Sequence, residues 1–363
     1  MKLIAIDYSP AQSSPAGIGQ YSINLTKYLL KNDHQNKYLI FSIKPITDFP
    51  LPENVQNIVI PYAKHFPAKG LRYMRKLVKI VKQEKADILL SLSNHALALM
   101  FKRTYLFIHD LAPLHYPQYF PISARIIYPR SAKLGAQKAL KVITISNTVK
   151  EDIITTFKIP GSKVEVIYPS LNSQLFEQKN ETKLDFELPQ TFLFSVSTLE
   201  PRKNYTGAIK ALKLLENTHP DLHYLISGKK GWYYEQIYSL IKKLHLESKV
   251  HLLGYRSDAE VAAIFPKASG FLYLSHYEGF GMPPLEAIKY DIPLLLSDIK
   301  VFRECFNGYA RFVPADDIKK IAEGMAALLE KPQPKINGAK LLDKFSWDKS
   351  ALKLISIMNN NDQ

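Results

Sequence analysis

The sequence contains almost no cysteine and no apolar run long enough to cross a membrane, and both absences limit what the protein can be. Cys305 is the single cysteine among 363 residues, so an internal disulfide framework is excluded and a reducing compartment is favoured. No apolar run reaches the roughly 18 residues of a bilayer span, and residues 1–7 become polar too soon for a signal peptide. The sequence also lacks Cys/His clusters at zinc-ligand spacing and an Asp-x-Asp metal motif. We therefore expect a cytoplasmic protein without a structural disulfide or zinc.

Positive charge is abundant and unevenly distributed along the chain. The formal net charge is +15. Residues 1–170 contain 23 Lys and Arg against 10 Asp and Glu, whereas the remainder contains 25 against 23. A basic N-terminal half favours an anionic partner, which could be a nucleic acid, an anionic membrane surface or a phosphorylated acceptor.

Strand-like apolar runs alternate with helix-like periodic runs from start to end, which predicts parallel sheets covered by helices on both faces. The expected strands are residues 3–6, 38–42, 88–91, 104–108, 142–145, 192–197, 222–227, 250–253, 270–274 and 293–297. Expected helices include 19–31, 71–83, 205–215 and 258–265. We expect two doubly wound domains, residues 1–170 and 191–344, joined by a linker over 171–190. A cleft should form between the carboxyl ends of their strands.

The segment from residue 275 to residue 286 reads Ser-His-Tyr-Glu-Gly-Phe-Gly-Met-Pro-Pro-Leu-Glu and carries the most information. It joins an expected strand to an expected helix over 285–290, and Pro284 suits the first turn of that helix. A helix entered this way directs free N–H groups and its positive dipole end at phosphate. Glu278 and Glu286 are good acceptors for sugar hydroxyls. The combination predicts a ligand with phosphate and polyhydroxyl parts, which is a nucleotide sugar.

Three further motifs follow expected strands. The first, Ala16-Gly17-Ile18-Gly19, could let the backbone approach a phosphate or could be a flexible loop before a helix. In the second, His109-Asp110-Leu111, the histidine could donate to a ligand or be satisfied by the backbone, and Asp110 could orient His109 or cap the next turn. The third is Glu200-Pro201-Arg202-Lys203-Asn204. Two cations before a helix oppose its dipole, so a bound polyanion would relieve them.

A basic amphipathic helix is expected over residues 69–82. An apolar stripe is formed by Leu71, Met74, Leu77, Val78 and Val81. Lys and Arg fill most of the remaining faces. Such a helix could lie on an anionic membrane, or could pack its stripe into its own domain, and the sequence favours neither.

Six motifs, which follow one another along the chain in the family's order, resemble those of the retaining glycosyltransferases with the GT-B fold, the group 1 or family-four class. The element from Glu278 to Glu286 carries most of the resemblance. The other similar segments are Ala16-Gly17-Ile18-Gly19, Ile108-His109-Asp110-Leu111, Val142-Ile143-Thr144-Ile145-Ser146-Asn147, Glu200-Pro201-Arg202-Lys203-Asn204 and Phe345-Ser346-Trp347. The resemblance implies two Rossmann-like domains with a cleft between them, the first binding the acceptor and the second the nucleotide sugar. It also implies a helix over about 345–360 that crosses back to the N-terminal domain.

The resemblance implies roles for individual residues. Glu278 would bind sugar hydroxyls and face the anomeric carbon, His109 would contact the same sugar, and Lys203 would neutralise the departing diphosphate. The donor-binding set would further include Gly17, Gly19, Arg202, Tyr255, Gly279, Phe280, Gly281, Met282 and Glu286. The chain departs from many relatives in having Ser197 and Thr198 where they have an arginine, which leaves open whether Arg202 supplies that charge.

The implied function is a metal-independent transfer of a hexose from a GDP- or UDP-linked donor, with no other cofactor. Mannose is suggested by the similarity of residues 228–232 and 200–204 to mannosyltransferase-like relatives. The acceptor would be lipid-linked or an oligosaccharide in cell-surface polysaccharide synthesis, with the enzyme peripheral to the inner face of the cytoplasmic membrane. Candidate acceptor contacts are Asn94, His95, Tyr116, Arg125 and Arg130. Retention favours same-face attack by the acceptor, with Glu278 as a covalent nucleophile the weaker alternative.

Two non-catalytic functions remain as alternatives, a basic nucleic-acid-binding protein and a membrane-binding scaffold. No motif interleaves aromatic and basic residues in the way that nucleic-acid binding requires, so we expect no nucleic-acid partner. The full set of donor-site motifs disfavours a scaffold without catalysis.

Overall fold

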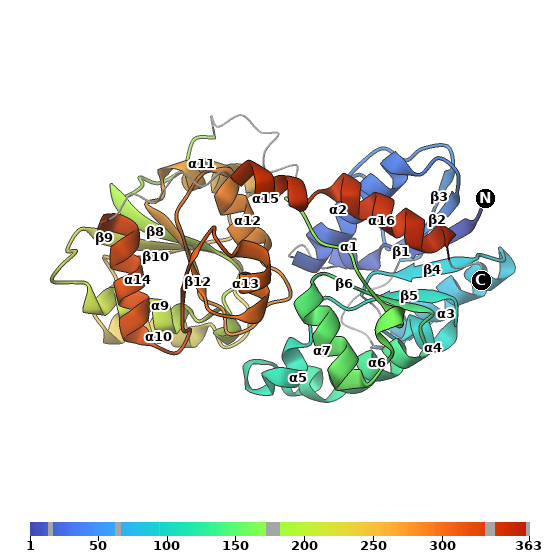
Figure 1. The fold of residues 1–363 in the computed structure, drawn as a ribbon, viewed down its shortest axis with the longest axis horizontal. Helices are drawn as coiled ribbons and strands as arrows, with labels where there is room; N and C mark the ends of the chain where they lie inside the picture. Colours follow the sequence, from blue (N-terminus) through green and yellow to red (C-terminus); the bar gives the residue numbers. More distant parts are fainter. Residues whose placement is uncertain (14–16, 62–66, 94, 172–181, 331–337, 361–363) are drawn as a thin grey trace. The chain divides into compact units, whose positions relative to one another are not determined.

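The computed structural model describes residues 1–13, 17–61, 67–93, 95–171, 182–330 and 338–360, which belong to two compact units (Figure 1). The first unit comprises Met1–Leu114, Ile122–Pro169 and Phe345–Gln363. The second comprises His115–Pro121 and Ser170–Lys344. The short segment His115–Pro121 thus belongs to the second unit although the chain on both sides of it belongs to the first. Within the predicted linker, residues 172–181 lie outside the described residues.

The first unit is built on a parallel sheet with the strand order β3-β2-β1-β4-β5-β6-β7. Its strands are β1 Leu3–Asp7, β2 Lys37–Ser42, β3 Val55–Val59, β4 Ile88–Ser91, β5 Thr104–Phe107, β6 Lys141–Thr144 and β7 Val164–Val166. The central strands are nearly continuous apolar runs and are buried, as expected for a parallel sheet covered on both faces. The order reverses between β1 and β4, which makes this pair the switch point of the doubly wound sheet.

Helices cover the sheet of the first unit. They are α1 Ser9–Ser13, α2 Gly17–Asn32, α3 Pro67–Gln83, α4 Leu97–Met100, α5 Ala112–His115, α6 Ile122–Lys138, α7 Asn147–Phe157 and the C-terminal α16 Trp347–Asn359. The last of these packs against α2 (Figure 1). Trp347 meets the ring of Tyr21 edge to face with centroids 5.4 Å apart, and Ser350 donates to the carbonyl of Tyr168 at 2.6 Å. The predicted return of the C-terminal helix to the first domain is therefore confirmed.

The second unit has a parallel sheet with the order β10-β9-β8-β11-β12-β13. Its strands are β8 Thr191–Val196, β9 Leu222–Ser227, β10 Val250–Gly254, β11 Gly270–Tyr273, β12 Leu294–Ser297 and β13 Arg311–Val313. Its helices are α9 Tyr205–Leu214, α10 Glu235–Lys243, α11 Asp258–Ile264, α12 Met282–Lys289, α13 Lys300–Phe306, α14 Ile318–Glu330 and α15 Gly338–Lys344. The strand order reverses between β8 and β11. The loops that leave these two central strands are where a doubly wound sheet binds its ligand.

Each of the ten predicted strands is present, as are helices at the predicted positions, so the predicted α/β class is confirmed. The structure adds three strands that the sequence analysis missed, β3, β7 and β13, each at the edge of its sheet.

The predicted basic amphipathic helix corresponds to α3. Tyr73, Leu77, Val78 and Val81 are buried in the first unit, while the Lys and Arg side chains described on this helix are exposed. Most of the stripe therefore packs inward, as in the second of the two alternatives left open for this helix, although Leu71 at its start is exposed. None of the described helices combines the length and the apolar character that a bilayer span needs.

Candidate active site

The loop that follows β8 places three charged side chains at the switch point of the second unit. It continues through Glu200 into a single 3₁₀ turn, Pro201–Lys203, and then into α9. Asn204 ends this turn in the left-handed conformation, with φ 55° and ψ 36°, and its side chain accepts from the N–H of Gly207 at 3.2 Å as the cap of α9. Asparagine tolerates this conformation better than most residues, and so the sequence sets the direction in which Arg202 and Lys203 project.

The loop that follows β11 carries Glu278 and enters α12 through Gly281. Gly281 has φ 120°, a conformation that residues with a side chain rarely adopt, and a Cβ there would lie 3.0 Å from the ring of Phe302. Only glycine fits at this position. The neighbouring Phe280 is buried and packs near Phe306, with ring centroids 6.2 Å apart. Phe280 therefore anchors the loop, and only its backbone is left to meet a ligand.

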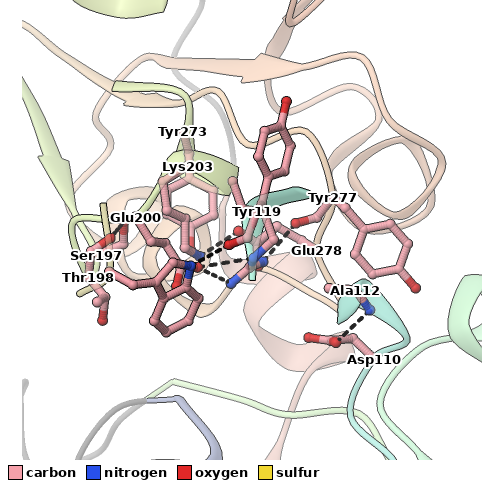
Figure 2. Close-up of polar contacts among 12 residues, drawn as sticks. Asp110, Ala112, Tyr119, Ser197, Thr198, Glu200, Lys203, Tyr273, Tyr277 and Glu278 are labelled. Atoms are coloured by element: carbon pink, nitrogen blue, oxygen red, sulfur yellow. Dashed lines mark hydrogen bonds and ion pairs between the residues drawn. The ribbon is translucent and has the colours of Figure 1, made fainter. Parts of the chain in front are cut away.

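The two loops meet in a buried network of ion pairs (Figure 2). The ammonium of Lys203 lies 2.5 Å from Oε1 of Glu278 and donates to the hydroxyl of Tyr273 at 2.8 Å. The guanidinium of Arg202 contacts Oε2 of Glu278 at 3.0 Å and Oε1 of Glu200 at 2.6 Å. Lys203 and Arg202, which precede Glu278 by 75 and 76 residues, are thus held against it at the carboxyl ends of adjacent strands.

Burial and neighbouring charge act in opposite directions on this network. Burial would raise the pKa of Glu278, but the charges of Arg202 and Lys203 outweigh it and lower the pKa to about 2. Burial and Arg202 lower the pKa of Lys203, against the carboxylates of Glu278 and Glu200. The network therefore holds Glu278 as a carboxylate between two cations.

These contacts correct part of the sequence interpretation. The side chains of Arg202 and Lys203 are largely buried, only 12% and 9% exposed. The conflict with the dipole of α9 is relieved by Glu200 and Glu278 within the protein itself, so a bound polyanion is not required to explain the pair.

The N-terminus of α12 has fewer N–H donors than we expected. The helix begins at Met282, and the next two residues are Pro283 and Pro284. Proline has no N–H, so two of the first four donors of the helix are missing. The positive end of the dipole remains. Anion binding here therefore depends more on Lys203, Arg202 and the glycine backbone than on the helix amides.

Glu286 is a buried carboxyl group in the middle of α12, past the first turn in which the sequence placed it. Its side chain has no hydrogen-bond or ion-pair partner among the described residues, although the residue is only 7% exposed. Burial, together with the nearby Asp258, raises its pKa to about 8. A carboxyl group without a protein partner can accept hydrogen bonds from a ligand that supplies hydroxyl donors.

Tyr255 follows β10 and is exposed, with the ammonium of Lys229 4.4 Å from its ring centroid. Its predicted role beside the nucleobase, and the predicted backbone roles of Gly279 and Met282, stay predictions.

A short strap, residues 115–121 of the second unit, packs against the loop that carries Glu278. Its Tyr119 ring stacks on His276, with centroids 5.3 Å apart and planes at 26°. On the other side Tyr116 lies parallel to Tyr119, with centroids 5.9 Å apart, and contacts Tyr277 at 5.7 Å. Both residues that precede Glu278 are therefore in contact with the strap.

Trp232 holds the same strap through Tyr119 and the neighbouring Phe120. The indole N–H of Trp232 donates to the carbonyl of Tyr119, and the Trp232 and Phe120 rings lie 5.4 Å apart. Arg202 binds the same loop from inside the unit, since its guanidinium donates to the carbonyl of Tyr277 at 2.7 Å. The Glu278 loop is thus held by the strap as well as by Arg202.

We expect Tyr119→Ala to lower kcat about tenfold or more, because small displacements of reacting groups are costly to rate, with little change in the KM for the donor. Tyr119→Phe keeps the ring and should retain near wild-type kcat. Steady-state kinetics with saturating acceptor separate the two parameters. An equal loss in both variants would show that the hydroxyl, rather than the ring stack, matters.

His109 lies at the end of β5 in the first unit and is buried. Its Nε2 lies 2.8 Å from the carbonyl of Leu92, and because a carbonyl only accepts, Nε2 carries the proton. Burial lowers the pKa of His109, against the hydrogen bond with Leu92 and the charge of Asp110. A neutral ring with this tautomer leaves Nδ1 as an acceptor. Nε2 is therefore satisfied by the backbone, the second of the two alternatives left open for this residue, and Nδ1 is left to accept from a hydroxyl.

Other first-unit predictions are resolved in different ways. Asp110 accepts from the N–H of Ala112 at 2.9 Å and so caps the next turn. Gly17 and Gly19 are helical residues in the first turn of α2, not parts of an open loop, and Ala16 lies outside the described residues. His95 is half-buried beside Tyr128, with ring centroids 4.9 Å apart, and its predicted contact with the acceptor stays a prediction.

The sequence analysis missed two parts of the candidate site. Glu200 lies two residues before Arg202 and is buried beside it, so its position in the motif could have drawn attention to it. Of the strap, the sequence analysis named only Tyr116, as a candidate acceptor contact. The strap's contacts carry no local signal, because they join segments more than 100 residues apart.

The whole chain is similar to known glycosyltransferases. The family model described as "Glycosyl transferases group 1" matches residues 176–348, and "Glycosyltransferase Family 4" matches residues 15–175. The O-antigen chain mannosyltransferase RfbU of Salmonella typhimurium is 30% identical over 62% of this chain, and the alignment spans 61% of that protein's length. The O-antigen chain mannosyltransferase B of Escherichia coli is 23% identical over 96% of this chain and 97% of its own.

Solved structures extend the similarity to the fold. Anabaena Alr3699/HepE, crystallised in complex with UDP-glucose, superimposes with a TM-score of 0.75 at 17% identity, covering 99% of both chains. The two parallel sheets described above are those of the GT-B fold. Together with the two adjoining family matches, this agreement confirms the resemblance seen in the sequence: the chain belongs to the GT-B glycosyltransferases of the group 1 and family 4 class.

Proposed function

We propose that this glycosyltransferase moves a hexose, with mannose the leading candidate, from a GDP- or UDP-linked donor to a lipid-linked or oligosaccharide acceptor in cell-surface polysaccharide synthesis. The observation that carries the proposal is the buried contact of Lys203 and Arg202 with Glu278. This contact places two cations beside a carboxylate at the switch point of the second unit. A diphosphate and a sugar need this pair of opposite charges side by side.

The mechanism follows from where charge develops. The bond between the anomeric carbon and the diphosphate oxygen breaks, which leaves negative charge on the phosphate and positive charge on the sugar ring. Lys203 and Arg202 stabilise the first, and Glu278 the second. Because these groups are already held in place, no reorganisation is needed as the charges appear. We infer that they do the work that a metal ion would otherwise do.

Retention of configuration is part of the proposal. The acceptor hydroxyl attacks the face from which the diphosphate departs, its oxygen bonds to the anomeric carbon, and its proton passes to the departing phosphate oxygen. Glu278 is poorly suited to be a covalent nucleophile, because two cations hold its oxygens at 2.5 Å and 3.0 Å. This geometry favours same-face attack over a glycosyl-enzyme intermediate.

Hydroxyl groups of the donor would bind to hydrogen-bond acceptors of the protein that have no other partner among the described residues. Glu286 would bind the ribose hydroxyls, since two vicinal hydroxyls can satisfy one buried carboxylate. Nδ1 of His109 would accept from the transferred sugar. The choice of mannose and of a surface polysaccharide rests on the names of the two O-antigen mannosyltransferases to which the chain is similar.

A thermal-shift panel of GDP-mannose, UDP-glucose, UDP-N-acetylglucosamine and ADP-glucose tests the donor. A ligand that binds only the folded state stabilises it by about 2.7 kcal/mol at a concentration 100 times its Kd, and we expect GDP-mannose to raise the Tm most. A larger shift with a UDP-sugar would overturn mannose. No shift with any nucleotide sugar would favour the scaffold without catalysis.

A further inference from the structure

The helix α6, residues Ile122–Lys138, exposes large aliphatic side chains to an unusual degree. Ile122 is 69% exposed, Ile127 is 65% exposed and Ile126 is 54% exposed, and Leu134 on the next turns is exposed as well. Singly exposed apolar residues are ordinary, but a group of them on one element marks an interaction surface. The first unit therefore presents an apolar face along α6.

The inner face of α6 explains why these side chains cannot turn inward. The residues that pack on the unit are small, namely Ala132, Gly135 and Ala136. A Cβ at Gly135 would lie 2.8 Å from the carbonyl of His95. The helix is therefore seated close to the sheet by small residues. At about 100° per residue, Ile126, Ile127 and Leu134 fall on the opposite side of the helix and Ile122 on its flank, and all four remain exposed.

Positive charge is interleaved with these aliphatic residues. Arg130, Lys133 and Lys138 are exposed on the same helix. The chain contains no Asp or Glu at all between residues 111 and 150. The α6 face, which we define as Ile122, Ile126, Ile127, Arg130, Lys133, Leu134 and Lys138, is therefore both apolar and purely cationic. The helix α4, which packs beside α6, adds the exposed Leu99.

The chemistry of this face selects one kind of partner. A second copy of the chain would bring like charges together, which is unfavourable for a symmetric contact. Nucleic acid is recognised by cations and stacking aromatic rings, not by isoleucine. An anionic lipid surface can bind both the cationic and the aliphatic side chains of this face. Phosphate head groups pair with Lys and Arg, while aliphatic side chains enter the acyl boundary.

We propose that the α6 face docks on an anionic lipid bilayer. The basic helix α3, which the sequence singled out, exposes its cations but buries most of its apolar stripe, so it adds mainly electrostatic attraction. The proposal deepens the lipid-linked acceptor of the proposed function, because an enzyme seated on the bilayer meets its acceptor in two dimensions. Lipid binding itself does not depend on which sugar is transferred.

Sedimentation with vesicles tests the proposal on the full-length protein. We expect co-sedimentation with vesicles of phosphatidylglycerol and phosphatidylcholine, weaker association with phosphatidylcholine alone, and loss of part of the binding in high salt. The double variant Ile126→Ser/Ile127→Ser should lower the partition coefficient about tenfold or more. Lys133→Gln/Lys138→Gln should lower it less and should remove part of the salt dependence.

The control is Lys76→Gln/Lys79→Gln, which removes the same charge from exposed positions of α3 and should change partition less than the isoleucine variant. Circular dichroism and the donor-induced thermal shift check that each variant folds. A wild-type protein that does not bind anionic vesicles, or an isoleucine variant that binds as well as wild type, would overturn the proposal. The donor shift is read separately, so a failed lipid assay leaves the proposed transfer reaction standing.

Discussion

Replacing Lys203 with methionine is expected to lower turnover by about 10²–10³-fold or more, the cost of removing one preorganised charge from a developing anion. Glu278→Gln should lower it by a similar factor, since the carboxylate no longer stabilises the sugar cation. Steady-state transfer assays measure both. The matched control is Lys210→Ala, which removes an exposed lysine from α9 and should leave turnover unchanged.

The structure also predicts how the same changes affect stability. Removing one partner of a buried ion pair strands the other, at a cost of about 3–5 kcal/mol, so each single variant should unfold at lower denaturant concentration. The double variant Lys203→Met/Glu278→Gln removes both charges and should recover much of that loss. Its activity should not recover.

This difference separates a structural role from a chemical one. If the pair only held the loops together, activity and stability would return together in the double variant. Turnover within a few-fold of wild type in either single variant would contradict the site itself.

Glu286→Gln is expected to raise stability and weaken donor binding at once. The folded-state pKa of about 8 lies well above the ordinary value of 4.5, so the stabilising contribution of the protonated group is complete below pH 4.5 and is lost as pH rises towards 8. At pH 7, which is 2.5 units above the ordinary pKa, the stabilisation lost amounts to about 3 kcal/mol at 1.36 kcal/mol per unit. Glutamine cannot ionise, so the variant should melt several degrees higher at neutral pH.

Binding should follow the opposite course with pH. Ribose hydroxyls donate to the carboxylate form, so wild-type affinity for the donor nucleotide should rise from pH 6 to pH 9, and the variant should lose this dependence. Calorimetric titration at several pH values, beside thermal melts in the same buffers, measures both effects. Glu323→Gln, which changes an exposed carboxylate on α14, should alter neither. A variant that binds donor like wild type at pH 8 would remove Glu286 from the site.

All the interior strands could be predicted from the sequence, but of the four edge strands only β10 could. The central strands, such as residues 88–91 and 192–196, are apolar on both faces because helices cover both faces. The missed strands read Val-Gln-Asn-Ile-Val, Val-Glu-Val and Arg-Phe-Val. A strand at the edge of its sheet has one neighbour and more solvent, so its residues carry too little apolar pattern to stand out.

The motifs of the site could be located from the sequence, but not their mutual contacts. The Glu278 loop and the Arg202–Lys203 turn each showed a local pattern of charge, glycine and proline. Their ion pairs depend on β8 and β11 lying side by side in the sheet, which the sequence does not show. The sequence analysis therefore treated the conflict of Arg202 and Lys203 with the helix dipole as unrelieved within the protein. The prolines of α12 were visible in the sequence, yet their cost in N–H donors became clear only once the start of the helix was fixed at Met282.

The strap at His115–Pro121 has a practical consequence for anyone who divides this enzyme. Its aromatic rings contact the two residues that precede Glu278. It is nevertheless synthesised with the first unit, before β8 and the rest of the second unit. A fragment that starts at Ser170 would lack Tyr119 and leave Trp232 and His276 uncovered. A fragment that stops at Pro169 would contain Tyr116 and Tyr119 but not Tyr277 and His276, against which they pack. It would also lack α16. Neither half is therefore self-sufficient, and intact chains are the unit on which the chemistry should be studied.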